Sequence, residues 1–254
     1  MTMPQWTCPA LSQFPPLPPE QVHVWRVRLD LARDSLHFLR ATLSPDELVK
    51  AGKFHFDKDR EQFIVARGLL RILLGRILAV KPLDLQFSYN TFGKPLLAPD
   101  TGKQGIWFNL AHSEAIALYA FARDHRVGVD VERIQLEVDW DKIAERFFAA
   151  REIQILRSLP ESERGKTFFD CWTRKEAYLK ARGDGLSSAL NTFEALGAPG
   201  EPIVVEASQD GYEGILRWTL QDIPIDEGYS AALAVEGPLP VVKYWQWPHD
   251  GAEP

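Results

Sequence analysis

The chain has 254 residues, of which 45% are hydrophobic and 25% are charged, and its formal net charge is −6 at pH 7. These proportions are ordinary for a globular protein, and the length allows one large domain or two smaller ones. The acidic balance argues against a general nucleic-acid binder, because phosphate groups are bound by basic surfaces. No apolar run reaches the roughly 18 residues that a membrane span requires, so we expect no membrane association.

The cysteines and the N-terminus bear on the compartment. Cys8 and Cys171 are the only cysteines, and they lie too far apart in the sequence to indicate a disulfide framework. The first residues lack the basic and then apolar segments of a secretory signal. We therefore expect a cytoplasmic protein.

The first half of the chain predicts an extended segment, a strand and two helices. Residues 1–20 are rich in proline and are expected to form an extended lead-in. Alternation over residues 22–29 predicts a strand, and Ser44-Pro45 is typical of a helix start. A long helix is expected from Lys58 to about Val80. Three arginines on one side of it indicate either a solvated face or an anion site: Arg60, Arg67 and Arg71.

Short strands and polar turns follow up to residue 125. Strands are expected at residues 86–89, 106–110 and 115–122. In the turn 90–97, backbone amides beside Gly93 and the ammonium of Lys94 could cradle a phosphate, but on this evidence alone a plain turn is favoured. The polar turn 111–114 carries His112, which on this evidence alone is an ordinary loop histidine.

An acidic strand opens the second half of the chain. Alternation over residues 126–134 places Asp130 and Glu132 on one side of a strand. Neighbouring carboxylates raise each other's pKa unless a cation lies between them. Carboxylate oxygens suit Mg²⁺, so the pair indicates a metal site, and the alternative is an exposed edge-strand face.

Two helical segments come next. Residues 141–159 are amphipathic and form either a core stripe or a docking surface for an acidic partner. A second helix is expected to begin at Thr173 as N-cap, with Trp172, Glu176 and Lys180 on one face. The alternative for these residues is a capping box and an ordinary ion pair within the helix.

The remaining pattern predicts the fold class. A stop is expected at residues 183–186, then strands at 203–207, 215–220 and 229–235, and a tail over residues 241–254. Both halves read as an extended segment, a long helix and several strands. We therefore predict an α/β (α+β) fold of two similar α/β lobes in one chain, a pseudo-dimer in which each lobe packs a small sheet against a long helix. The lobes are assigned to residues 21–125 and 126–240, and the junction between them is a favoured place for a ligand.

The motifs, taken together, resemble a known family. Residues 127–132 followed by residues 172–180 resemble the paired signature of 4′-phosphopantetheinyl transferases, and the flanking segments resemble the longer, Sfp-type members. Further segments match in the expected order: Gly93-Lys94-Pro95, residues 108–113, Arg146-Phe147-Phe148 with Glu152, and residues 183–186.

The resemblance implies an activity and a set of roles. The enzyme would transfer the phosphopantetheine arm of coenzyme A to a serine of an acyl or peptidyl carrier protein, and release adenosine 3′,5′-bisphosphate. Mg²⁺ would be held by Asp130, Glu132 and Glu176, and Lys180 would stabilise the departing oxygen. The general base would be Glu176 or Glu152. Coenzyme A would be contacted by Lys50, Gly93, Lys94, Pro95, Asn109, Ala111, His112 and Asp130.

The resemblance also bears on partners and leaves alternatives open. Carrier proteins are acidic, as this chain is, so recognition has to be local, and residues 142–157 with Phe147 and Phe148 are the hypothesis for it. A monomer is expected, because the long members join both lobes in one chain. Some relatives have a serine at the position of Ala111 and a basic residue at the position of Glu47. These two differences leave open how tightly this chain binds coenzyme A. The alternatives are another Mg²⁺-dependent pyrophosphate enzyme, a non-catalytic module that binds coenzyme A or a carrier, and a plain interaction protein.

Overall fold

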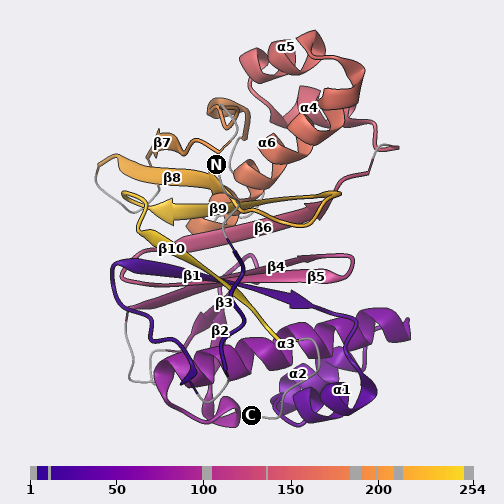
Figure 1. Ribbon diagram of the computed structural model, residues 1–254, viewed down its shortest axis with the longest axis vertical. Helices are drawn as coiled ribbons and strands as arrows, with labels where there is room; N and C mark the ends of the chain where they lie inside the picture. The colour runs from indigo at the N-terminus through magenta and orange to yellow at the C-terminus, as the bar shows by residue number, and fades with distance from the viewer. Residues whose placement is uncertain are drawn as a thin grey trace.

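Figure 1 shows the computed structural model of the chain, in which two layered α/β units are stacked on each other. The structure describes residues 5–10, 13–98, 105–135, 137–183, 190–197, 200–208 and 214–248. Predictions that concern residues 1–4, Gly185, Leu186 or residues 249–254 lie outside the described residues. The predicted arrangement of two α/β lobes in one chain, each with a small sheet against a long helix, is confirmed. No helix of the described residues combines the length and the apolar character that crossing a bilayer requires.

The first lobe is built on a four-stranded sheet with the order β10-β1-β5-β4. The strands are β1 (Gln21–Arg28), β4 (Ile106–Ser113), β5 (Ile116–Arg123) and β10 (Val241–Gln246). The other elements are the helices α1 (Arg33–Arg40), α2 (Pro45–Ala51) and α3 (Asp57–Leu78), the 3₁₀ turn η2 (Pro82–Asp84), and the small hairpin β2 (Phe87–Tyr89) and β3 (Pro95–Leu97). Alternation along β1 buries Trp25 and Val27 against the apolar side of α3, which forms the core of this lobe.

The arginines of α3 do not form a solvated face. Arg67 and Arg71 donate from their Nε atoms to the two carboxylate oxygens of Glu47, at 2.6 and 2.5 Å, and all three side chains are buried. Arg60 is more exposed and pairs with Asp57. A buried carboxylate needs such partners to offset its lost hydration. Glu47 therefore neutralises two arginines of α3. Because Arg71 is buried and paired with Glu47, it is not part of an anion site.

The second lobe has the sheet order β6-β9-β8-β7. Its strands are β6 (Val127–Arg133), β7 (Ile203–Ala207), β8 (Leu216–Asp222) and β9 (Tyr229–Glu236), and its helical elements are α4 (Trp140–Phe147), α5 (Ala150–Ser158), α6 (Glu161–Arg182) and the 3₁₀ turn η5 (Leu190–Thr192). The single amphipathic segment predicted over residues 141–159 is two helices, because Phe148 adopts an extended backbone and packs its ring 5.2 Å from that of Phe168.

Helix α6 begins at Glu161, well before the predicted start. Thr173 is an interior, buried residue whose Oγ1 donates to the carbonyl of Phe169 at 2.9 Å. The predicted N-cap and capping box at this residue are therefore wrong. A threonine side chain can bond the carbonyl one turn back, so its presence alone does not mark a helix start.

Gly128 lets α6 lie directly on β6. A Cβ atom at this position would lie 2.1 Å from the carbonyl oxygen of Ala177 and 2.3 Å from the backbone nitrogen of Ala181. Both contacts are with backbone, so no side-chain movement could relieve them. Because helix and strand lie so close, side chains of β6 can contact side chains that lie one turn apart on α6.

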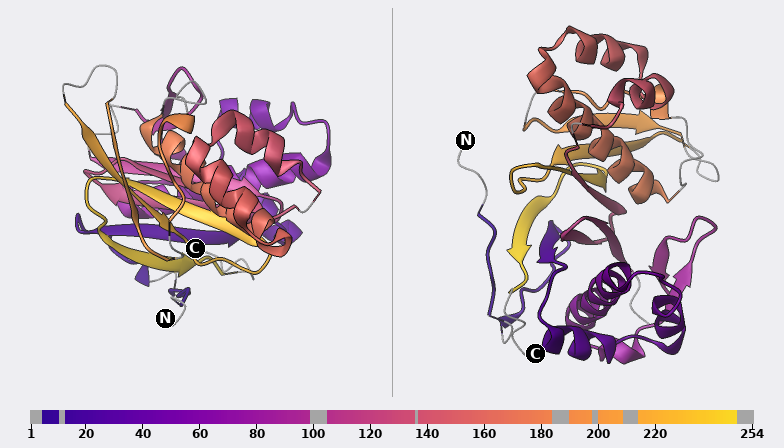
Figure 2. Two further views of the ribbon diagram at one scale, coloured as in Figure 1. Left: turned by 90° about the horizontal axis from the view of Figure 1, so that it is seen from above. Right: turned by 90° about the vertical axis from the view of Figure 1, so that its right-hand side faces the viewer.

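The lobes meet through the faces of their sheets. A third apolar cluster fills the junction, and its members include Val22, Val24, Leu118, Ala120, Val129, Val131, Leu233 and Val235. β6 is an edge strand of its sheet, yet Val127–Val131 are buried, so the predicted alternative of an exposed edge-strand face is wrong. The segment predicted as a tail contains β10, which crosses back and pairs in parallel with β1 (Figure 2).

Candidate active site at the lobe junction

Three carboxylates and one ammonium group gather where β6 meets α6. Lys180 Nζ lies 2.5 Å from Asp130 Oδ1, and this ion pair ties the helix to the strand. Glu132 follows on the same side of β6, and Glu176 lies one turn before Lys180 on α6. The predicted alternative of an ordinary pair within the helix does not describe Lys180, whose partner is on another element.

The cluster contains more carboxylates than ammonium groups, and the pKa values of its carboxylates are raised. Burial, with the nearby charge of Asp130, raises the pKa of Glu176 from 4.5 to about 7. Burial and Asp130 also raise the pKa of Glu132. For Asp130, burial outweighs the attraction of Lys180, so its pKa is raised as well. One ammonium group does not neutralise three carboxylates, and the cluster therefore favours a cation.

Asp130 has an unused oxygen. Its Oδ1 is bonded to Lys180, whereas its Oδ2 is buried and has no hydrogen-bond partner in the described part of the chain. A buried acceptor without a partner is uncommon and calls for a ligand or water. Among the described residues, no group of three or more His, Cys, Asp or Glu side chains is arranged as a metal site.

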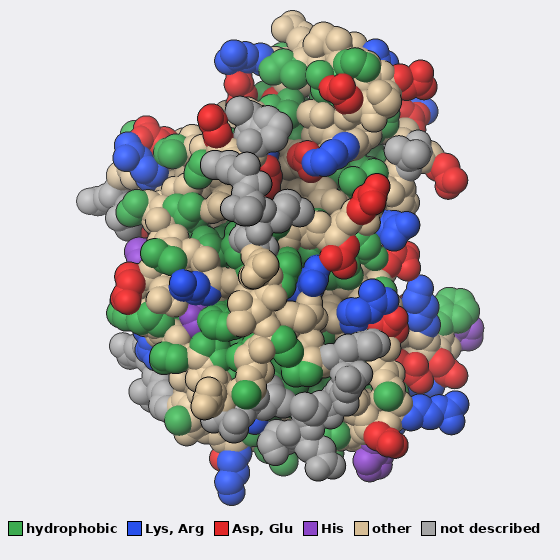
Figure 3. Space-filling model, viewed as in Figure 1, with side chains coloured by type: hydrophobic (Ala, Val, Ile, Leu, Met, Phe, Trp, Pro, Cys, Tyr) green, Lys and Arg blue, Asp and Glu red, His purple; other side chains and the backbone are tan. Residues whose placement is uncertain are grey.

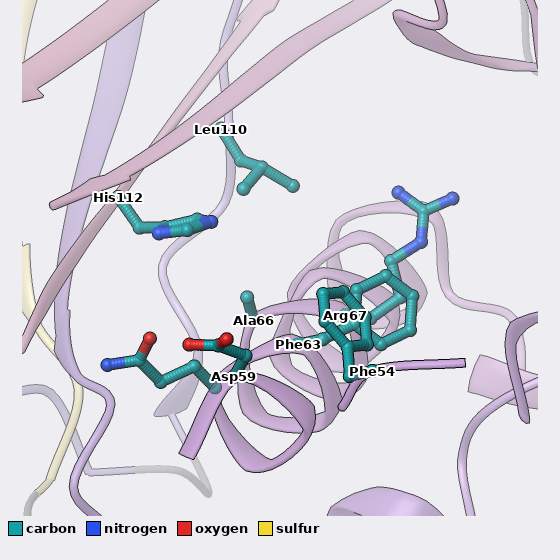
Figure 4. A pocket seen from close by; sticks show the side chains of 8 residues that line it. Phe54, Asp59, Phe63, Ala66, Arg67, Leu110 and His112 are labelled. Carbon is teal, nitrogen blue, oxygen red and sulfur yellow. The ribbon is translucent and has the colours of Figure 1, made fainter. Parts of the chain in front are cut away.

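A pocket of about 310 Å³ lies on the first-lobe side. Figure 4 shows His112 and Leu110 projecting from β4 towards residues from α3 and the segment before it, and the pocket is lined by Phe54, Asp59, Gln62, Phe63, Ala66, Arg67, Leu110 and His112. Partial burial, and then the charge of Lys180, lower the pKa of His112. The pocket and the charged cluster are therefore close enough to interact. Lys50 stands beside the pocket, with Nζ 5.5 Å from the centre of the Phe63 ring.

The sequence placed residues 111–114 in a turn, but β4 continues to Ser113. Asn109 Oδ1 accepts a hydrogen bond from the backbone N–H of Val129 at 2.8 Å. Ala111 belongs to the apolar cluster of the junction. The side chains of these two residues thus face the second lobe, whereas His112 faces the pocket.

The hairpin that carries Gly93, Lys94 and Pro95 contacts the end of α6. Gly93 has φ +79°, which its lack of a side chain permits. Lys94 Nζ donates to the carbonyl of Lys180 and, at 3.2 Å, to that of Ala181. Asn90, which the sequence did not single out, donates from Nδ2 to the carbonyl of Gly183 at 2.8 Å. Here Lys94 interacts with the negative end of the helix.

Glu152 lies inside the second lobe and away from solvent. Its oxygens accept from the backbone N–H groups of Ala149 and Ala195 at 2.7 and 2.6 Å, and Lys175 Nζ lies 2.9 Å from Oε2. Lys175 is itself buried and also donates to the carbonyls of Leu190 and Phe193. The carboxylate of Glu152 thus holds α5, α6 and the segment after η5 together, and the structure does not bring it to the charged cluster.

Comparisons with known proteins identify the class. A family model described as the 4′-phosphopantetheinyl transferase superfamily matches residues 126–234, and one described as 4′-phosphopantetheinyl transferase, N-terminal, matches residues 31–124. The chain belongs to the 4′-phosphopantetheinyl transferase superfamily and is a transferase.

Individual relatives cover most of the chain. It is 39% identical over 228 residues to the 4′-phosphopantetheinyl transferase HetI of Nostoc sp., across 90% of this chain and 93% of the relative. It is 31% identical over 250 residues to a putative 4′-phosphopantetheinyl transferase of Synechocystis sp., across 91% and 97%. It is 28% identical over 205 residues to the 4′-phosphopantetheinyl transferase Sfp of Bacillus subtilis, across 77% and 83%.

Proposed function

We propose that this enzyme transfers the 4′-phosphopantetheine group of coenzyme A to a serine of an acyl or peptidyl carrier protein. Adenosine 3′,5′-bisphosphate would be the second product. The observation that carries the proposal is the ion pair of Asp130 on β6 with Lys180 on α6 at 2.5 Å, beside the lobe junction, with Glu132 and Glu176 near enough to Asp130 for their pKa values to be raised. Such a cluster beside a pocket suits the binding of a metal and a pyrophosphate.

Mg²⁺ suits the donor chemistry of the described residues at this site, although their side chains are not already arranged as a metal site. Asp130, Glu132 and Glu176 offer hard oxygen donors, and the buried Oδ2 of Asp130 is an acceptor in need of a partner. These three side chains would hold the ion. When bound, Mg²⁺ neutralises charge on the pyrophosphate and orients the leaving phosphate.

Coenzyme A would lie across the junction. The pocket beside His112 would take part of the nucleotide, with Lys50 at its edge. Gly93, Lys94 and Pro95 would approach from the hairpin, and Lys94 could reach a phosphate by leaving the end of α6. Asn109 and Ala111 would act on this pocket through the backbone of β4, because their side chains face the other way.

The transfer is a displacement at phosphorus. The serine oxygen of the carrier forms a bond to the phosphate next to pantetheine, and the bond from that phosphorus to the bridging oxygen of the pyrophosphate breaks. Lys180 stabilises the negative charge on the departing oxygen. Glu176 receives the serine proton, because of the two candidate bases it is the one that lies in the charged cluster with Asp130, Glu132 and Lys180. We assign Glu152 a structural role, because the N–H groups of Ala149 and Ala195 and the ammonium of Lys175 already engage its oxygens.

The carrier would dock locally on the second lobe. Figure 3 shows acidic and basic side chains intermixed over one face of the molecule, so that face as a whole does not offer a basic surface to an acidic carrier. Arg146 and Arg151 are exposed on α4 and α5. Phe148 is buried and cannot take part, whereas Phe147 is partly exposed. We further propose a cytoplasmic monomer, because one chain supplies both lobes.

The test is the intact mass of the carrier. An apo acyl carrier protein and an apo peptidyl carrier protein are each incubated with the enzyme, coenzyme A and Mg²⁺. The expected result is a gain of one phosphopantetheine that is absent with EDTA and absent when the carrier serine is alanine. No gain on either carrier, with coenzyme A still raising the melting temperature, would contradict transfer and leave binding only.

A further inference from the structure

Two strands from different lobes lie side by side and are joined by side chains. β4 and β6 are both edge strands of their sheets, so alternate backbone groups of β6 lack a strand partner. Asn109 Oδ1 accepts from the N–H of Val129 at 2.8 Å, and Ser113 Oγ accepts from the N–H of Arg133 at 3.0 Å. Both donors and both acceptors are four residues apart, so side chains of β4 take the place of a neighbouring strand.

Ser113 makes a second contact that Asn109 does not. Its Oγ lies 3.1 Å from Oε2 of Glu132. A serine hydroxyl has one hydrogen and two lone pairs. Because the N–H of Arg133 occupies a lone pair, the hydrogen is available for the carboxylate. The hydroxyl therefore holds Glu132 Oε2 in one place relative to the backbone of its own strand.

We propose that Ser113 is a positioning residue that orients Glu132 for Mg²⁺ and couples the metal-binding strand to the first lobe. This inference rests on the proposed function. Groups that hydrogen-bond a metal ligand fix its orientation, and their loss typically lowers metal affinity about 10- to 100-fold. His112 is the adjacent residue of β4 and lines the pocket. One strand thus presents a pocket residue on one side and supports a metal ligand on the other.

The test compares Ser113→Ala with Ser113→Thr. Threonine keeps a hydroxyl and suits a strand, whereas alanine removes the donor. Mg²⁺ binding is measured by calorimetry and by the Mg²⁺-dependent rise in melting temperature, both with coenzyme A present, alongside the Mg²⁺ concentration that gives half-maximal transfer. Ser158→Ala is the matched control, because Ser158 Oγ donates only to a helix carbonyl, that of Ile155.

We expect Ser113→Ala to weaken Mg²⁺ binding about tenfold, and Ser113→Thr to stay within about twofold of the natural enzyme. Unchanged Mg²⁺ affinity in Ser113→Ala, or equal loss in both variants, would overturn the inference. Should Ser113→Ala fail to fold, Ser113→Cys gives the same comparison, since a thiol donates weakly. If the natural enzyme itself transfers nothing, the proposed function fails; if it transfers normally and Ser113→Ala matches it, only this inference fails.

Discussion

Glu176 is held in a position that favours its chemistry and works against folding. Its pKa is raised from 4.5 to about 7 by burial and by the charges of Asp130 and Glu132. A carboxyl whose pKa is raised in the folded state costs stability when it ionises. Its cost is absent below pH 4.5, grows as the pH rises, and is complete above about pH 7, where it amounts to roughly 3 kcal/mol.

Removing this charge should therefore stabilise the metal-free protein. We expect Glu176→Gln to raise the free energy of unfolding by about 1–3 kcal/mol at pH 8 and to change it little at pH 4.5. Urea unfolding at the two pH values, in EDTA, measures this. A variant that is less stable than the natural protein at pH 8 would show that the carboxylate is stabilised in the fold.

For single residues, the sequence predicted the element that carries each site residue better than it predicted the atoms that the residue contacts. Alternation on β6 and the helical spacing on α6 placed Asp130, Glu132, Glu176 and Lys180 correctly on their elements. The contacts of Glu152 and Lys94 could not be predicted, because they depend on distant backbone groups such as that of Ala195. Periodicity predicts on which face of a helix or strand a side chain lies, but it does not predict which residues of other elements that side chain contacts.

Gly128 is the residue on which the packing of two elements depends. A Cβ there would lie 2.1 Å from a backbone oxygen of α6. We expect Gly128→Ala to lower the free energy of unfolding by at least about 3 kcal/mol, because helix and strand would have to separate. The same separation should weaken transfer, since Asp130 and Lys180 would move apart.

The matched control is Gly52→Ala. Gly52 has φ −67°, and an added Cβ would meet nothing closer than 3.5 Å, so this variant should be neutral or slightly stabilising. Thermal unfolding of both variants makes the comparison. Equal effects at positions 52 and 128 would contradict the close approach of α6 to β6.

The helices α4 and α5 carry the docking hypothesis. We expect Arg146→Glu combined with Arg151→Glu to raise the KM for the carrier about three- to tenfold and to leave the KM for coenzyme A unchanged, because reversed charges repel an acidic partner. Arg217→Glu is the control, since Arg217 is an exposed arginine of β8. Carrier kinetics that are the same in all three proteins would remove these helices from the docking surface.

Elements with local signals were predicted well, and those that depend on distant pairing were not. Strong alternation predicted β7, β8 and β9 within a few residues. The first half of α6 is polar and lacks a clear start signal, so its beginning was missed. β10 was missed because its partner, β1, lies at the opposite end of the chain.

At the scale of the whole molecule, the C-terminal strand β10 links the two lobes. β10 leaves the second lobe and completes the sheet of the first (Figure 2). Directly after β10, Trp247 is buried near Trp25. The first lobe therefore includes residues from both ends of the chain. This arrangement couples the stability of the two lobes.

We expect Trp247→Ala to lower the free energy of unfolding by about 3–5 kcal/mol, because a large side chain would leave a cavity in the core of the first lobe. Val241→Ala, at the start of β10 and 55% exposed, should change it by less than about 1 kcal/mol. Chemical denaturation measures both. A Trp247→Ala variant as stable as Val241→Ala would show that the strand only lies on the surface.

The most direct measurement compares two glutamates, each replaced by glutamine. The account predicts that Glu176→Gln loses about 10²- to 10⁴-fold in the rate of phosphopantetheine transfer while its melting temperature does not fall. It predicts that Glu152→Gln loses melting temperature, because Lys175 is left buried with a weaker partner, but keeps most of its transfer rate where it is folded. The opposite result, with transfer lost in Glu152→Gln and retained in Glu176→Gln, would contradict the site at the lobe junction.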